Sequence, residues 1–157
     1  ELQTLLEAAV EAPSASNSQS WHFTVIQDKN LIDFISDQTK KGMLQSDVDY
    51  VKRTGASSAS ILYNAPTVII VSGKKEISSS LVDCSAAIEN MLIAAESIGL
   101  GAVWIGLVRF FFAVEDNVKK LYLPEGYVPY FAVSIGYKEN PEVRPINRNR
   151  DVVNYIR

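Results

Sequence analysis

The chain has 157 residues, of which 47% are hydrophobic and 21% charged, a composition typical of one soluble domain with a packed core. Its net charge of -3 argues against a nucleic-acid partner, because binding to phosphates needs clustered positive charge. Cys84 is the only cysteine, which excludes an internal disulfide. One local basic cluster lies near the C-terminus and is large enough for a small phosphate group: Arg144, Arg148, Arg150 and Arg157.

No apolar run reaches the roughly 20 residues that a membrane-spanning helix needs, and no signal-peptide pattern opens the chain. We therefore expect a cytoplasmic protein without a membrane partner. The first residues already lie within a helical pattern, and no initiator Met precedes them. We accordingly expect a single domain over residues 1–157 that lacks an N-terminal segment.

Apolar residues at helical spacing over residues 2–10 predict a first helix, which ends before Pro13 because proline lacks a backbone donor. Six polar side chains follow between residues 14 and 20, and the segment from Trp21 to Gln27 then alternates like a strand. Asn17 and Gln19 carry uncharged amides, which suit the edge of a planar heterocycle with carbonyl and ring-nitrogen positions. The alternative is a serine-rich turn in which Asn17 bonds its own backbone.

The middle of the chain predicts a helix, an irregular stretch and a buried strand. The segment from Leu31 to Ile35 indicates a short helix that ends near Gly42. Residues 45–60 lack a persistent apolar period, and their charges indicate a solvated face or a mobile cover. Thr67–Val71 is β-branched and continuously apolar, so we expect a strand that is buried on both faces.

The best-defined helix spans Leu81–Ile98, where apolar residues recur at three- and four-residue steps and Gly99 supplies a left-handed stop. Within it, Cys84 is expected to be a small core residue rather than a reactive thiol. The remaining predicted elements are a short buried strand or turn at Ala102–Leu107, a small helix at Val114–Tyr122, a long strand at Pro129–Tyr137 and one further strand at Asp151–Ile156.

Helices thus alternate with few strands through varied connections, which favours an α+β fold: a mixed, mainly antiparallel central sheet flanked by helices. The alternative is a small flavodoxin-like parallel sheet. Against it, no predicted strand is followed by a phosphate-cradling loop that opens a helix.

The chain offers few side chains for acid–base or metal chemistry. His22 is the only histidine; no GxSxG elbow accompanies it, and with a single cysteine it cannot complete a zinc site. We expect it to be partly exposed on its strand. Glu115 and Asp116 are adjacent on a helix, point in different directions and are expected to be surface charge. Such a chain suits chemistry that a bound cofactor performs.

Three segments resemble the nitroreductase family of flavin enzymes. Ala12–Phe23, APSASNSQSWHF, is similar to the APSxxNxQPW segment of that family. Gly99–Leu107, GLGAVWIGL, follows a helix containing AAIENMLIAAESIG and resembles the core helix and flavin-contacting turn of the family. Pro124–Tyr137, PEGYVPYFAVSIGY, is similar to its late strand. The three segments occur in family order and span most of the chain.

The resemblance implies a nitroreductase-like fold that binds FMN at a homodimer interface, with the flavin performing the chemistry and no catalytic side chain. From one subunit, the ring or its ribityl chain would be lined by Pro13, Ser14, Ala15, Asn17 and Gln19. From the other subunit, the ring would be approached by Trp104, Ile105 and Gly106. A backbone amide of Ile105 or Gly106 would bond flavin N5, and the phosphate would be held by Arg148 and Arg150.

Some of these positions allow a second interpretation. Gly106 lacks a Cβ and would let the backbone lie against a flat ligand, but it could instead bend a core strand. Arg148 and Arg150 would also suit an ordinary exposed tail. Ser20 stands where the family more often has proline, and we expect this change to loosen the turn. His22 stands where arginine or lysine is common.

The implied function is that of an FMN-dependent oxidoreductase that transfers hydride from NADH or NADPH to a small acceptor such as a nitroaromatic or a quinone. One alternative is a flavin enzyme of the same fold with another chemistry, flavin fragmentation or reductive dehalogenation, whose substrate lid would correspond to Met43–Ser60. Another alternative is a non-catalytic flavin-binding module. The absence of the Arg-Arg-Ser-x-Arg type segment with which nitroreductase-like proteins usually begin supports this last alternative.

Overall fold

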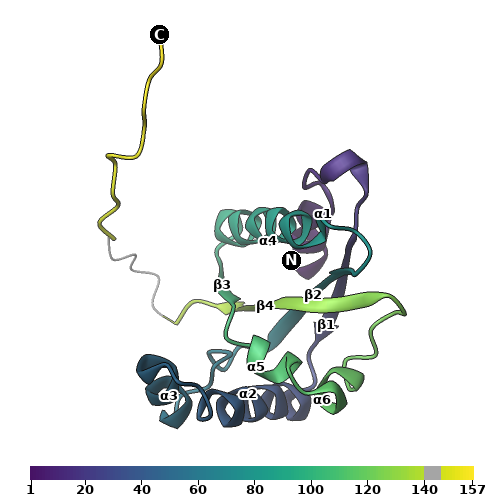
Figure 1. The fold of residues 1–157 in the computed structure, drawn as a ribbon, viewed down its shortest axis with the longest axis vertical. Helices are drawn as coiled ribbons and strands as arrows, with labels where there is room; N and C mark the ends of the chain where they lie inside the picture. The colour runs from purple at the N-terminus through teal and green to yellow at the C-terminus, as the bar shows by residue number, and fades with distance from the viewer. Residues whose placement is uncertain (140–145) are drawn as a thin grey trace.

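One antiparallel sheet forms the centre of the molecule (Figure 1). The computed structural model describes residues 1–139 and 146–157, and within them the strand order is β1-β2-β4-β3. The strands are β1 (Trp21–Ile26), β2 (Thr67–Lys74), β3 (Leu100–Ile105) and β4 (Tyr127–Tyr137). Each pairing among these strands is antiparallel, and together with the flanking helices this confirms the α+β prediction.

Helices cover both faces of the sheet. On one face lie α1 (Leu2–Val10) and α4 (Ser80–Ser97), which pack against each other. The other face is covered by α2 (Lys29–Met43), α3 (Asp49–Ala56), α5 (Arg109–Phe112) and α6 (Glu115–Lys119) (Figure 1). A 3-10 turn, η1 (Ala15–Asn17), lies in the connection between α1 and β1. None of the helices in the described ranges is long and apolar enough to cross a bilayer.

The central strand β2 explains this layering, because it is buried on both faces, as its continuous apolar run predicts. Successive side chains of a strand point to opposite faces of a sheet. Ile69 and Val71 therefore join the core beneath α1 and α4, whereas Val68 and Ile70 join the core beneath α2 and α5. Both helix layers are thus anchored to alternate residues of one strand.

Helix α4 confirms the prediction of a long helix. It spans Ser80–Ser97, and Gly99 just beyond it adopts φ +80°, as a left-handed stop requires. Cys84 is fully buried on the inner face of α4. Burial, and secondarily the neighbouring charge of Asp83, raises the pKa of the Cys84 thiol to about 12. Cys84 is therefore a core residue, as expected, and not a reactive thiol.

The interpretation of residues 45–60 as a solvated face or a mobile cover misses helix α3, which buries Val51 and Gly55. A Cβ on Gly55 would lie 2.9 Å from the Cβ of Met43, so glycine lets α3 lie close to α2. This contact depends on few side chains, too few to produce a periodic apolar pattern in the sequence.

Two later segments also differ from their predictions. Asp151–Ile156 forms no strand and is exposed along its length. A strand needs a neighbour to satisfy its backbone groups, and none reaches this segment among the described residues of a single chain. Val114–Tyr122 contains only the short helix α6, and α5, which precedes it, has no counterpart among the predicted elements.

Substitution of Gly73 on β2 tests how closely β2 and α4 pack. A Cβ at this position would lie 2.0 Å from Ser80 Oγ and 2.8 Å from Tyr130 Cε2. Gly73→Ala should therefore lower the free energy of unfolding by about 1–3 kcal/mol, the usual cost of overpacking. Gly106→Ala is the matched control, because its Cβ would meet nothing within 4 Å. Urea denaturation measures both variants, and a Gly73→Ala variant as stable as the wild type would contradict the prediction.

Candidate functional site

A hollow of about 450 Å³ opens at the carboxyl end of β3, within the usual size range of small-molecule sites. One of its sides is the end of β3 with the turn that follows, and the other is the C-terminal part of α3 with its connection to β2. The lining residues are Thr54, Ser57, Ala59, Ser60, Ile61, Tyr63, Asn64, Trp104, Ile105, Gly106 and Leu107. Their polar side-chain groups are hydroxyls, one amide and the indole N–H of Trp104, and none of these side chains is charged. Such a lining favours a neutral ligand surface.

The three residues predicted at the end of β3 all line this hollow. Ile105 is buried at the end of the strand, and Trp104 packs edge-on against Phe131 with ring centroids 5.0 Å apart. Gly106 is exposed and follows the last residue of β3, so it does not bend a core strand. A Cβ on Gly106 would meet nothing within 4 Å, so the packing of this chain does not itself require glycine there.

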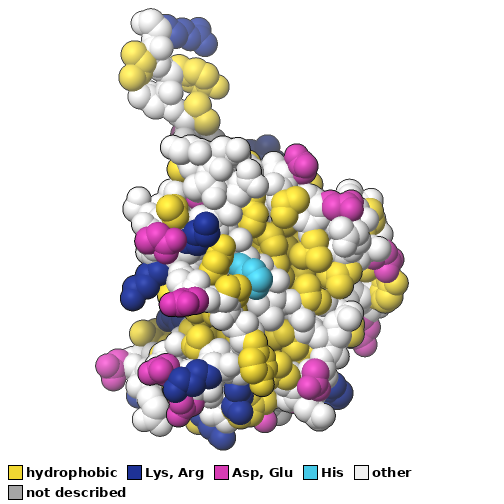
Figure 2. All heavy atoms as spheres, turned by 90° about the vertical axis from the view of Figure 1, so that its right-hand side faces the viewer, with side chains coloured by type: hydrophobic (Ala, Val, Ile, Leu, Met, Phe, Trp, Pro, Cys, Tyr) yellow, Lys and Arg dark blue, Asp and Glu magenta, His cyan; other side chains and the backbone are white. Residues whose placement is uncertain are grey.

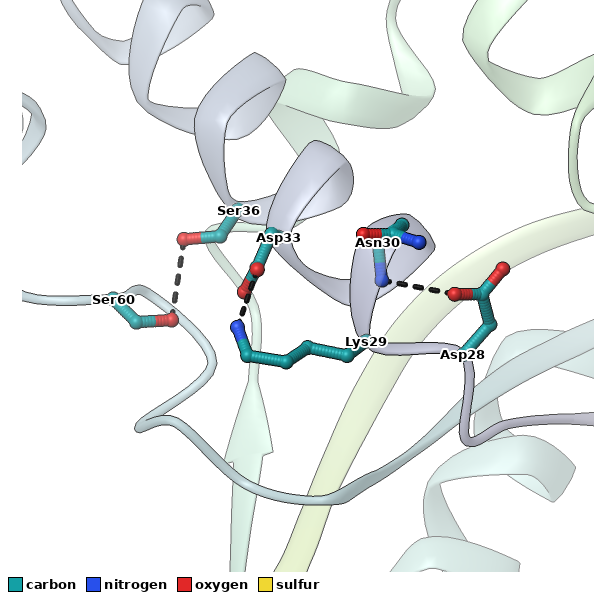
Figure 3. A network of polar contacts seen from close by, with 6 residues as sticks. All are labelled: Asp28, Lys29, Asn30, Asp33, Ser36 and Ser60. Atoms are coloured by element: carbon teal, nitrogen blue, oxygen red, sulfur yellow. Dashed lines mark hydrogen bonds and ion pairs between the residues drawn. The ribbon is translucent and has the colours of Figure 1, made fainter.

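The opposite wall of the hollow is held in place by Ser36 of α2 (Figure 3). Buried Ser36 accepts hydrogen bonds from Ser60 Oγ at 3.2 Å and from the backbone N–H of Ile61 at 3.1 Å. The first turn of α2 is itself capped by Asp28, whose carboxylate accepts from the N–H of Asn30 at 2.9 Å. The wall is therefore tied to a capped helix at Ser60 and Ile61.

The main sequence prediction names none of this wall, and Ile61, Tyr63 and Asn64 also lie outside the alternative lid over Met43–Ser60. Tyr63 and Asn64 adopt φ of 59° and 54°, a conformation that residues other than glycine rarely adopt. The available signal is weak: a run of serines followed by Asn64 and Pro66 has the composition of a turn, without indicating a ligand. The alternative lid over Met43–Ser60 shares Thr54, Ser57, Ala59 and Ser60 with this wall.

The loop that connects α1 to β1 presents the other predicted residues at the surface. Pro13, Ala15, Asn17 and Gln19 are exposed, and Ser14 is half-buried. The side chain of Gln19 donates from Nε2 to Asn17 Oδ1 at 3.1 Å, and the N–H of Gln19 donates to Ser14 Oγ at 3.0 Å. The segment is thus a turn held by its own polar groups, as the alternative expects, but the Asn17 oxygen accepts from the side chain of Gln19 and not from its own backbone.

Asp83, in the first turn of α4, holds this loop. Its carboxylate accepts hydrogen bonds from the N–H of Ala15 and from the hydroxyls of Ser18 and Ser20, each at 3.0 Å. Ser20 is fully buried, and its carbonyl accepts from the N–H of Lys74 at 2.9 Å. The hydroxyl of Ser20 ties the turn to α4, a contact that the expectation of a looser turn does not include.

The loop and the hollow lie at opposite edges of the sheet. The loop precedes β1 and the hollow follows β3, and these are the two edge strands of the order β1-β2-β4-β3. Three inter-strand spacings, about 14 Å, separate strand β1 from strand β3 across the sheet. The loop is bonded to α4 and the hollow is lined by the end of α3, and these two helices lie on opposite faces of the sheet (Figure 1). One chain therefore brings Trp104, Ile105 and Gly106 together but does not bring residues 13–19 to them.

The charged residues singled out from the sequence lie at the surface where they are described. Arg148 and Arg150 belong to the exposed C-terminal tail, and neither lines the hollow; Arg144 falls outside the described residues. Glu115 and Asp116 have side chains that are 86% exposed, which confirms them as surface charge. In the part of the chain that the structure describes, no group of three or more His, Cys, Asp or Glu side chains could hold a metal ion.

Comparison with known proteins agrees with this architecture. The profile of the nitroreductase family matches residues 1–137. The chain belongs to the nitroreductase family. A relative from Archaeoglobus fulgidus, described as a candidate NADH dehydrogenase/NAD(P)H nitroreductase, is 32% identical over 149 residues, which cover 89% of this chain and 74% of the relative.

Two solved nitroreductases have the same fold as this family member. A nitroreductase with bound FMN from Bacteroides fragilis has a TM-score of 0.84 and 28% identity, covering 99% of this chain and 86% of that one. A nitroreductase with bound FMN from Desulfitobacterium hafniense has a TM-score of 0.88 and 26% identity, with the same coverage of 99% and 86%. The nitroreductase-like fold implied by the sequence resemblance is thus confirmed.

Asp83 makes the stability of this nitroreductase-family protein depend on pH. Burial alone would raise the pKa of Asp83, but hydrogen bonds from Ala15, Ser18, Ser20 and Ser79 favour the carboxylate and lower the pKa below its ordinary value. A lowered native pKa stabilises the folded protein above the pKa of the unfolded chain, about 3.9, and this contribution is lost as the pH falls through the native value.

Asp83→Asn should therefore lower the free energy of unfolding by about 1.5–3 kcal/mol near neutral pH, and the loss should shrink below about pH 4. Asp116→Asn is the control: its side chain is 86% exposed, so its change in unfolding free energy should be much smaller than that of Asp83→Asn. Urea denaturation across this pH range measures both differences. A loss on Asp83→Asn that stays constant with pH would contradict the prediction.

Proposed function

We propose that this protein is an FMN-dependent oxidoreductase that takes hydride from NADH or NADPH and passes electrons to a small acceptor such as a nitroaromatic or a quinone. The observation that carries the proposal is the uncharged hollow at Gly106, where backbone can approach a flat ligand with no Cβ in between. Support also comes from a relative described as an NAD(P)H nitroreductase candidate and from neighbours solved with bound FMN.

The residues of the hollow fit a flavin. Hydroxyls of Ser57 and Ser60 and the amide of Asn64 offer donors and acceptors for the carbonyl and nitrogen edge of the ring, and Trp104 adds apolar surface. When bound, FMN supplies the atom that accepts hydride, N5. The pairing of β3 with β4 ends at Ile105, so the next backbone N–H lies beyond the sheet, where it can donate towards that atom.

We further propose that two copies of the chain complete each site. The loop of residues 13–19 and the hollow lie at opposite edges and on opposite faces, so a ring in the hollow of one chain would meet the loop of a second copy. Figure 2 shows hydrophobic side chains gathered around His22 on the face that carries the β1 edge. Among the described residues β1 pairs only with β2, which leaves its other edge available to a further strand.

The C-terminal tail fits this arrangement. Its large apolar residues are between 61% and 94% exposed: Ile146, Val152, Val153, Tyr155 and Ile156. Such a concentration of exposed apolar side chains gains stability by packing against another surface. In the proposed dimer the tail crosses to the second copy, where Asp151–Ile156 pairs with a strand of that copy. Arg148 and Arg150 then contact the FMN phosphate.

Mixed dimers test the shared site. Gly106→Val places a branched side chain in the hollow, and Asn17→Ala combined with Gln19→Ala removes both amides from the loop, so each homodimer should bind FMN roughly tenfold more weakly or worse. Dimers with one copy of each variant can be isolated by two different tags. They combine one intact loop with one intact hollow and should regain FMN binding at one of their two sites.

The wild-type protein provides the reference for this test. Light scattering should give about twice the chain mass of 17.3 kDa, and anaerobic NADH or NADPH should bleach the visible absorbance of the bound flavin. A wild-type monomer that binds FMN, or mixed dimers that bind none, would contradict the shared site. Bound flavin that neither nucleotide reduces would favour the non-catalytic module.

A second pair of variants distinguishes binding of the FMN phosphate from binding of the flavin ring. Replacing Arg148 and Arg150 with Ala removes charge-assisted hydrogen bonds worth roughly 1.5–3 kcal/mol each, so FMN should bind about tenfold more weakly or worse. Riboflavin, which lacks the phosphate, should bind as before. Gly106→Val should weaken both ligands alike. Titration of each variant with both flavins measures this, and equal losses of FMN and riboflavin in the double arginine variant would limit the tail to a structural role.

A further inference from the structure

We propose that Asp83 is a positioning residue for the cofactor, because its buried carboxylate holds residues 14–20 in the conformation that meets the flavin. The inference rests on the proposed function, in which this loop contacts FMN. Asp83 lies behind the loop and does not itself belong to the surface that would touch the ring. It acts through Ala15, Ser18 and Ser20.

The carboxylate of Asp83 collects donors from both elements that it joins. Oδ1 accepts from the N–H of Ala15 at 3.0 Å. Oδ2 accepts from the hydroxyls of Ser18 and Ser20 at 3.0 Å and from Ser79, at the start of α4, at 3.1 Å. An ionised carboxylate offers only acceptors, which matches a surrounding of donors. Asp83 is only 3% exposed, so water has little access to replace these bonds.

The loop needs such a tether because its backbone conformation is unfavourable by itself. Ser16, Asn17 and Gln19 adopt φ of 52°, 52° and 43°, in the left-handed region that residues other than glycine seldom occupy. The hydrogen bonds within the loop, from Gln19 to Ser14 and to Asn17, are exposed to competition from water. The bonds to Asp83 are better shielded, because the carboxylate is 3% exposed: the bond from Ser20 is buried, and those from Ala15 and Ser18 are part-buried. These bonds are therefore the ones that keep the strained conformation.

The place of Asp83 in α4 allows a buried charge to persist. It lies in the first turn, where the backbone N–H groups at the start of a helix favour negative charge. Ser79, the N-cap residue, makes no side-chain cap and donates its hydroxyl to Asp83 instead. The start of α4 and the loop thus form one hydrogen-bonded unit, so the position of the loop follows the position of α4.

Asp83→Asn tests the inference, because it keeps the shape of the side chain but replaces one acceptor oxygen with a donor NH₂ group. FMN and riboflavin should both bind about tenfold more weakly or worse, since the loop meets the ring and not the phosphate. The visible circular dichroism of the flavin that still binds should change. In the protein without flavin, the amide hydrogen of Ala15 should exchange roughly tenfold faster or more.

Two further variants distinguish a positioning role of Asp83 from a general effect on folding. Ser18→Ala combined with Ser20→Ala removes two donors, leaves Asp83 in place and should change affinity, dichroism and exchange in the same direction. Asn117→Ala is the matched control, because it removes another buried side-chain hydrogen bond, to the carbonyl of Phe111, in α6 on the opposite face of the sheet. It should leave all three quantities as in the wild type, at a temperature at which thermal melts show every variant to be folded.

A folded Asp83→Asn variant with wild-type flavin affinity, dichroism and Ala15 exchange would overturn the inference, and so would an equal loss of affinity in Asn117→Ala. If Asp83→Asn does not fold, the variant lacking the Ser18 and Ser20 hydroxyls decides between the same two results. A wild-type protein that binds no flavin would instead contradict the proposed function. In that case the exchange rate of Ala15 shows by itself whether Asp83 holds the loop.

Discussion

The burial of β2 on both faces is the constraint on which the rest of this structure depends. Residues 67–73 have no exposed face, so both sides of the sheet must be covered by helices. On one side α4 lies so close to Gly73 that a Cβ would not fit. This packing brings the first turn of α4 to the start of β1. A carboxylate 68 positions along the chain thereby comes within hydrogen-bonding distance of Ala15.

The order of the strands also determines where a ligand can reach the sheet. β4 lies between β2 and β3, so β3 becomes an edge strand and the turn after it is not covered by a further strand. The hollow at Gly106 can therefore open there. The same order sends the loop before β1 to the other edge. The loop and the hollow therefore lie at opposite edges and on opposite faces of the sheet in one chain, which is the physical basis for proposing a site shared between two copies.

The hollow and the loop, the two halves of the proposed site, differ in charge. The hollow is lined by neutral hydroxyls, an amide and apolar side chains, so a flat ring can enter without stripping water from a charged group. The loop, in contrast, depends on the buried charge of Asp83. Four hydrogen-bond donors compensate this charge: the N–H of Ala15 and the hydroxyls of Ser18, Ser20 and Ser79. Ser20, a departure from the usual family pattern, supplies one of these donors and so strengthens the turn.

The sequence by itself determined the elements whose signal is local. The apolar run of β2, the helical period of α4, the stop at Gly99 and the buried Cys84 all follow from neighbours a few positions apart. The family membership follows from three motifs in order along the chain. Only the tertiary structure decided the contacts between distant segments. The wall held by Ser36 joins positions 25 apart, and the bond from Ser20 to Asp83 joins positions 63 apart. The sequence does not show whether a serine or an aspartate faces water or a buried hydrogen-bond partner, because hydrogen bonding produces no periodic pattern along the chain. The strand expected at Asp151–Ile156 failed for the related reason that pairing needs a second backbone, which the segment's own residues do not specify.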